Sequence, residues 1–197
     1  MCIVHLLKFF SGCAELSKQF RKLGWIVHSI DISKGKQFDM TILANQNKIF
    51  KVFRAATYVH VALPCNTYSS ALRGRTVLRT RRYPYGRPDL LPRQQVVVDQ
   101  HNILLQFCIK IIKFCRRHLI PFSVGNPAGS KLWGMPDMRA EARDAKRNVC
   151  DFCACGTPLR KGRVFFLGAR RGLLFSMIIV VNSETVNVAF RNTRIKS

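Results

Sequence analysis

Short apolar runs alternate with amphipathic stretches along the first part of the chain. The run from Ile3 to Phe10 shows little polar alternation, which is typical of a strand covered on both faces of a parallel sheet. A turn at residues 11–14 and an amphipathic stretch that predicts a helix, Glu15 to Leu23, follow it. Gly24 favours a helix end, and Trp25 to Ile30 predicts a second strand. The opening therefore predicts a strand, a tight turn, a helix and a strand, which is half of a nucleotide-binding unit.

The same alternation continues downstream. Apolar residues at helical spacing predict one long helix over Gln94 to Arg117, whose last turn carries the cations that suit a helix C-terminus. Two shorter helices are predicted, one ending in Lys48 to Arg54 and one over Asp137 to Arg147. Further apolar runs predict strands at Tyr58 to Leu63, Pro121 to Val124, Val149 to Phe152, Val164 to Leu167, Leu173 to Val181 and Thr185 to Phe190. We expect one Rossmann-like α/β domain over residues 1–197, with a mostly parallel central sheet, helices on both faces and extra C-terminal strands.

The charge balance changes the picture from a generic α/β domain to one suited to polyanions. The chain has 33 Lys and Arg against 10 Asp and Glu, a formal net charge of +23. Phosphate backbones are the commonest partner for such a field, and counterion release would make the binding salt-dependent. We therefore expect a nucleic acid as partner. Anionic membrane surfaces are the alternative.

Seven arginines lie between Leu72 and Arg93, a segment rich in Arg, Pro and Gly without a steady period. The pattern predicts a loop or a mobile lid. Tyr83 and Tyr85 are interleaved with the arginines and offer rings that can stack on bases. The arginines expected to bind nucleic acid are Arg73, Arg75, Arg79, Arg81, Arg82 and Arg87. A merely solvated basic loop is the alternative.

The cysteines indicate neither secretion nor a metal site. The eight cysteines are not preceded by a signal peptide, and the longest apolar run, LLFSMIIVV, is too short for the ~20 residues of a membrane helix. We expect a soluble intracellular protein, cytoplasmic or nuclear, with reduced thiols. Cys150, Cys153 and Cys155 resemble half of a zinc site, but no second pair follows, so no metal is predicted.

Five short motifs occur in an order that resembles the DNA cytosine-5 methyltransferases. A glycine turn after the first strand and an acidic residue after the second are shared with dehydrogenases, but the chain has no G-x-G-x-x-G there. The series runs through residues 10–16, Asp31-Ile32, Pro64-Cys65, Asn126-Pro127 and residues 157–168. The loop LPCNTYSSALRGR is similar to that of compact methyltransferase-like proteins of phages and mobile elements. The resemblance implies a methyltransferase fold, S-adenosyl-L-methionine as cofactor, and DNA in preference to RNA as the nucleic-acid partner.

The resemblance also implies roles for individual residues. Cys65 would be the nucleophile that attacks a flipped-out pyrimidine at C6, Asn126 would lie at the target base, and Arg163 would assist or position phosphate. Asp31 would accept hydrogen bonds from the ribose of the cofactor. The remaining cofactor contacts would come from Phe10, Ser11, Gly12, Cys13, Ile32 and Pro64.

Three departures from that family keep a second hypothesis open. Gly125 stands where the family has the glutamate that holds the target base, and a general acid or base of this kind is worth about 10²–10⁴-fold in rate. Lys161 replaces an arginine and cannot supply the same planar fork. Only about thirty residues follow the last motif, too few for a large target-recognition region. The alternative is therefore a catalytically inactive protein of this fold that acts as a basic nucleic-acid-binding module.

Overall fold

The computed structural model describes residues 5–10, 15–53, 56–143, 145–151, 162–168, 174–181 and 186–193. Its central feature is a six-stranded sheet with the order β2-β1-β3-β4-β6-β5. Neighbouring strands pair in parallel from β2 through β1 and β3 to β4, and in antiparallel fashion from β4 through β6 to β5. The strands are β1 (His5–Phe9), β2 (Ile26–Ile30), β3 (Tyr58–Val61), β4 (Phe122–Pro127), β5 (Lys146–Asp151) and β6 (Gly162–Gly168).

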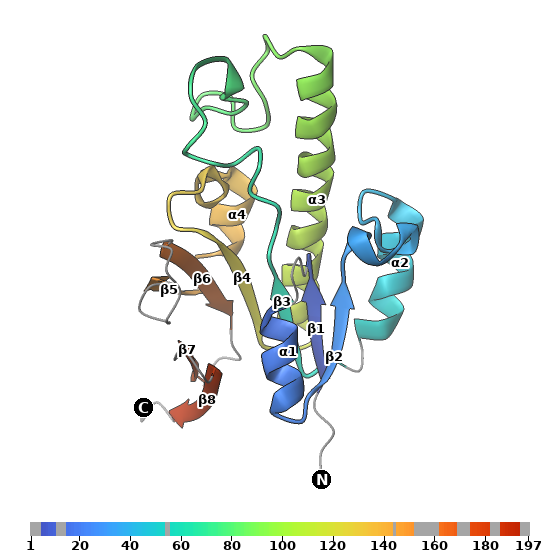
Figure 1. Ribbon diagram of the computed structural model, residues 1–197, viewed down its shortest axis with the longest axis vertical. Coiled ribbons are helices and arrows are strands. Elements are labelled where there is room, and N and C mark those ends of the chain that lie inside the picture. Colours follow the sequence, from blue (N-terminus) through green and yellow to red (C-terminus); the bar gives the residue numbers. More distant parts are fainter. Residues whose placement is uncertain are drawn as a thin grey trace.

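Helices cover both faces of this sheet, as predicted (Figure 1). On one face, Phe20 of α1 (Glu15–Lys22) packs with Leu6 and Tyr58. The opposite face carries the main core, which α2 (Leu43–Val52) and α3 (Pro92–Arg117) build against β1, β3 and β4. The predicted Rossmann-like architecture with a mostly parallel sheet is therefore confirmed.

The main core is rich in aromatic rings. Phe9 of β1 stacks on Phe53 at 5.5 Å between ring centroids and meets the edge of Phe107 of α3 at the same distance. All three side chains are fully buried. These contacts fix α3 and the end of α2 on the sheet, because ring pairs of this kind add to the free energy gained from buried area.

α3 extends well beyond the sheet, and the basic segment runs alongside this extension. In Figure 1 the arrowheads of β1 and β2 point toward the end of the molecule where the segment between β3 and α3 lies. The segment contains a short 3₁₀ helix, Gly74–Thr76, and α3 begins with Pro92, a residue suited to the first helical turn. The parallel strands therefore deliver their following loops toward the basic segment.

One predicted element differs from the structure. The helix predicted over Asp137 to Arg147 is wrong in its second half, since α4 (Pro136–Glu141) ends early and β5 already begins at Lys146. β5 is the last strand of the sheet, and an edge strand accommodates charged residues such as Lys146 and Arg147.

The predicted C-terminal strands are confirmed. β7 (Leu174–Val181) and β8 (Val186–Thr193) pair in antiparallel fashion as a separate two-stranded sheet. Within the described residues, no helix is long and apolar enough to cross a membrane.

Candidate active site and nucleic-acid interface

The predicted site residues lie on four segments that leave the same edge of the sheet. Parallel pairing of β2, β1, β3 and β4 places the carboxyl ends of these strands together. Phe10, Asp31 and Pro64 follow β1, β2 and β3, and Asn126 lies near the end of β4. In open α/β sheets this edge is where ligands bind.

The chain turns sharply as it leaves β1. Phe10 has a φ of 56°, in the left-handed region that bulky residues rarely adopt. Its backbone N–H donates to the carbonyl oxygen of Ile30 at 2.8 Å, which joins the ends of β1 and β2. The predicted contacts Ser11, Gly12 and Cys13 lie outside the described residues.

Asp31 begins the turn after β2. Its Oδ1 accepts hydrogen bonds from the backbone N–H of Ser33 at 3.0 Å and from the Ser33 hydroxyl at 2.7 Å, and it caps the 3₁₀ helix Ile32–Lys34. Ile32 is 61% exposed. A held carboxylate beside an exposed apolar side chain is chemically suited to a nucleoside, since the carboxylate can accept from ribose hydroxyls and the apolar side chain can contact the base.

Cys65 lies on the turn after β3 and is a free, half-buried thiol. Its carbonyl oxygen accepts from the backbone N–H of Tyr68 at 2.9 Å, which closes the turn. Tyr68 is fully buried, and its hydroxyl donates to the carbonyl oxygen of His101 in α3 at 3.1 Å. The turn therefore carries Cys65 at the carboxyl edge of the sheet. The buried Tyr68 side chain anchors the end of this turn in the interior.

The buried side chain of Asn126 contacts the backbone next to this turn. Its Nδ2 donates to the carbonyl oxygen of Leu63 at 2.8 Å, and its Oδ1 is buried without a hydrogen-bond partner among the described residues. Gly125 precedes it in β4, so no carboxylate is available at that position. Arg163 of β6 lies opposite Pro127 in the backbone register, which brings it to the same edge.

Arg79 is a buried residue of the basic segment and not a surface contact for nucleic acid. Its side chain is 1% exposed, and its guanidinium lies over the Tyr68 ring with Cζ 4.4 Å from the ring centroid. Four hydrogen bonds satisfy it, to Thr67 Oγ1 at 3.1 Å, Pro84 O at 2.9 Å, Asn102 Oδ1 at 2.7 Å and Val98 O at 3.1 Å. An unsatisfied buried cation is costly, so this set of acceptors explains why Arg79 points inward.

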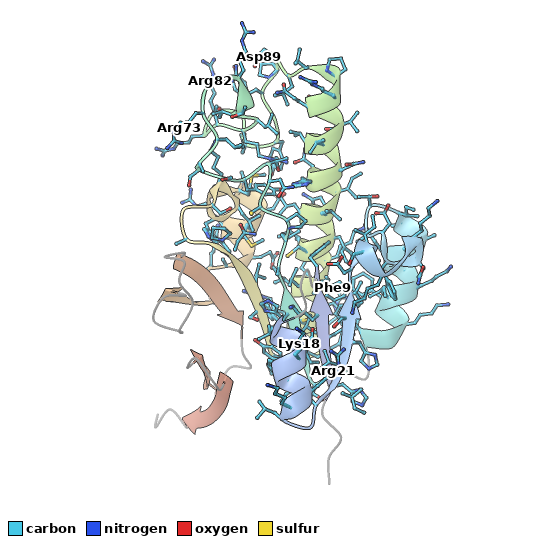
Figure 2. The ribbon with its side chains drawn as sticks, in the orientation of Figure 1. Phe9, Lys18, Arg21, Arg73, Arg82 and Asp89 are labelled. Atoms are coloured by element: carbon cyan, nitrogen blue, oxygen red, sulfur yellow. The ribbon has the colours of Figure 1, made fainter. Side chains whose placement is uncertain are left out.

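The other arginines of the segment are positioned differently. Arg73, Arg75, Arg81 and Arg82 are exposed, and Arg82 lies over the Tyr83 ring with Cζ 5.5 Å from its centroid. Arg87 is half-buried and forms an ion pair with Asp89. Figure 2 shows Arg73, Arg82 and Asp89 together on the basic segment, far from Arg21 on α1. The segment follows a defined path in the structure, because Arg79 fastens it to α3 and to the Cys65 turn.

The loop after β4 packs against the same turn. The backbone N–H of Lys131 donates to the Tyr68 carbonyl oxygen and its Nζ to the Arg79 carbonyl oxygen, both at 2.8 Å. Gly129 lies close to Ser70, so that a Cβ at this position would come within 2.9 Å of Ser70 Oγ and the serine side chain would have to rotate away. The Cys65 turn, the basic segment and the loop after β4 thus pack together.

Comparison with solved structures identifies the architecture. A methyltransferase of Entamoeba histolytica, EhMeth, matches with a TM-score of 0.52 at 12% identity, over 95% of this chain and 58% of its own. The Dnmt2 methyltransferase of S. pombe matches with a TM-score of 0.53 at 12% identity, over 85% and 50%. A prophage-encoded protein of E. coli, described as a DNA modification methyltransferase, matches with a TM-score of 0.51 at 13% identity, over 92% and 51%.

The chain has the methyltransferase fold. It spans between 50% and 58% of the length of these three methyltransferases. No family model matches the sequence, and no curated protein does either.

Sequence reasoning missed the buried residues behind the Cys65 turn. Thr67 Oγ1 lies 2.9 Å from Nδ1 of His101, and both residues are buried. The signal for His101 was its place on the inward face of α3, at helical spacing from Val98 and Leu105, where a polar side chain needs a partner. No comparable periodicity marked Arg79.

The environment of His101 generates a testable pH dependence. Burial, together with the nearby Arg79 cation, lowers the pKa of His101 to about 4 from its ordinary 6.5. The unfolded chain therefore takes up a proton at His101 between pH 6.5 and 4 that the folded protein does not. This residue should lower the free energy of unfolding by at most ~1.4 kcal/mol per pH unit as the pH falls through that window. Urea titrations of the wild type and His101→Gln between pH 7 and 4.5 should show a steeper loss in the wild type. Equal slopes would contradict the assignment.

Proposed function

We propose that this protein is an S-adenosyl-L-methionine-dependent nucleic-acid methyltransferase that acts on cytosine, in DNA rather than RNA, with Cys65 as nucleophile. The observation that carries the proposal is the half-buried Cys65 on a closed turn at the carboxyl edge, two residues after Leu63, whose carbonyl oxygen accepts a hydrogen bond from Asn126 of β4. The likeness to solved methyltransferases, one described as a DNA modification enzyme, supports it.

The residues at the ends of β1 and β2 fit the cofactor. The Asp31 carboxylate, held by Ser33, can accept from ribose hydroxyls, and exposed Ile32 can contact the adenine. Phe10, Ser11, Gly12, Cys13 and Pro64 are proposed to complete the pocket. When bound, the cofactor supplies a methyl group on a sulfonium.

Cys65 would act on a base flipped out of the helix stack, because C6 of a stacked pyrimidine is out of reach. Addition of the Cys65 thiolate to C6 makes C5 electron-rich enough to accept a methyl group, and loss of the C5 proton with release of the thiolate restores the ring. Asn126 has a buried Oδ1 without a partner among the described residues, so it can accept a hydrogen bond from an amino group of the base. Arg163, at the same edge, is proposed to position phosphate.

The exposed arginines are proposed to hold the nucleic-acid backbone. Arg73, Arg75, Arg81 and Arg82 are exposed on the segment that leads from the Cys65 turn, and Arg87 is half-buried on it. Tyr83 and Tyr85, 38% and 41% exposed, offer rings on which bases can stack. Arg79 is buried and therefore is not one of these proposed contacts.

Methyl transfer to cytosine-containing DNA, measured with a methyl-labelled cofactor, tests the function. We expect slow transfer by the wild type and none by Cys65→Ser, because a hydroxyl is far less nucleophilic than a thiolate at neutral pH. Gly125→Glu should raise the rate by roughly 10²-fold by restoring an acid, whereas the size-matched Gly125→Gln should not. Transfer that persists in Cys65→Ser would contradict the role of Cys65.

Gly125 specifically favours the second candidate function, a catalytically inactive nucleic-acid-binding module. Both functions require the basic segment to bind phosphates.

The logarithm of the association constant for duplex DNA should fall linearly with the logarithm of salt concentration. Arg81→Gln or Arg82→Gln should each reduce the steepness of that slope by about 0.9. Arg21→Gln on α1, where Figure 2 places it far from the segment, serves as the charge-matched control. Binding without methyl transfer in the wild type and in Gly125→Glu would favour the binding module, and unchanged slopes would exclude the segment as the interface.

A further inference from the structure

Arg79 connects three consecutive parts of the chain, namely the Cys65 turn, the basic segment and α3. Its Nε donates to Thr67 on the Cys65 turn, its Nη1 to Pro84 in the basic segment and to Asn102 of α3, and its Nη2 to Val98 of α3. The Pro84 contact lies two residues after exposed Arg82. One guanidinium therefore fixes the turn, the segment and the helix relative to one another.

The chemistry of this contact is specific to arginine. All four acceptors are uncharged, so the cation is stabilised by hydrogen bonds, by the Tyr68 ring beneath it and by the nearby charge of Asp99, and no carboxylate is among its hydrogen-bond acceptors. Donors on three nitrogens in one plane match acceptors on three segments, which the point charge of a lysine cannot do. Loss of any acceptor would leave a buried charged donor unsatisfied.

Thr67 is the link from this cation to the nucleophile. It lies two residues after Cys65, is fully buried, and shares its hydroxyl between Arg79 Nε and His101 Nδ1. Tyr68, the next residue, lies under the guanidinium and closes the Cys65 turn through its backbone N–H. The conformation of the turn is thus set from inside, by the side chains of Thr67 and Tyr68 rather than by the Cys65 side chain.

We propose that Arg79 is a positioning residue, which holds the Cys65 turn closed in a single conformation through Thr67 and Tyr68 and ties it to the basic segment. The inference rests on the proposed role of Cys65. It assigns to the segment a second role besides phosphate contact, because the loop that would grip the nucleic acid and the turn that carries the thiol share one buried anchor.

Alkylation of the thiols in the full-length protein tests this without requiring methyl transfer. The rate of modification of Cys65 by iodoacetamide is measured by peptide mass spectrometry, with the buried Cys108 and Cys115 of α3 as internal reporters of global unfolding. Arg79→Met and Arg79→Lys should both raise the Cys65 rate roughly tenfold while Cys108 and Cys115 stay protected, since loss of a charged hydrogen bond shifts a local equilibrium by about that factor. Arg21→Met on α1 removes an exposed arginine and should leave all three rates unchanged.

Substitutions of Thr67 decide the outcome if the Arg79 variants unfold and expose all three thiols. Thr67→Val keeps the shape of the side chain but removes the shared oxygen, so it should raise the rate at which Cys65 is alkylated. Thr67→Ser keeps the hydroxyl, so its rate of Cys65 alkylation should equal that of the wild type. A Cys65 rate that is unchanged in Thr67→Val, or raised equally in Thr67→Ser, would overturn the proposal. A failure of methyl transfer in the wild type, by contrast, would remove the proposed function and leave this result intact.

Discussion

Parallel pairing of β2, β1, β3 and β4 is the constraint on which the rest of the structure depends, because it brings the ends of four strands to one edge. Residues up to 116 positions apart in the sequence, Phe10, Asp31, Cys65 and Asn126, are brought to that edge without any of them having to cross the sheet. The buried aromatic contacts of Phe9, Phe53 and Phe107 then hold α3 against the sheet, so that its projecting half can support the basic segment. The sheet topology therefore places these residues at one edge, and the aromatic packing of α3 against the sheet orients the basic segment relative to them.

A second constraint is electrostatic. A chain with a formal charge of +23 must keep its cations in water or provide each buried one with acceptors. Four of the arginines assigned to nucleic acid are exposed, Arg87 is half-buried beside Asp89, and Arg79 is buried with four neutral acceptors. Arginine therefore has two roles in this segment. The exposed arginines are suited to contact phosphate, and the buried Arg79 fixes the segment to α3 and to the Cys65 turn.

The fold could be predicted from the sequence to a large extent because each element has a periodic signal. The long helix, the four parallel strands and the C-terminal strands all follow from apolar spacing, whereas the end of α4 was missed because Lys146 and Arg147 suit an exposed helix and an edge strand equally. Placement of Asp31, Cys65 and Asn126 at one edge follows from motif order and topology. The inward turn of Arg79 could not be predicted, since its acceptors lie on Thr67, Pro84, Val98 and Asn102, and only the tertiary structure brings these together. Residues 11–14 lie outside the described residues, so the predicted glycine turn remains a prediction.

The measurement that tests the account most directly is calorimetric titration of S-adenosyl-L-methionine into the wild-type protein, Asp31→Ala and Ser33→Ala. We expect binding by the wild type and by Ser33→Ala, which keeps the carboxylate, and roughly tenfold weaker binding by Asp31→Ala, because hydrogen bonds to a charged group are lost. No binding by the wild type, or equal binding by Asp31→Ala, would contradict the claim that this edge of the sheet is a cofactor site.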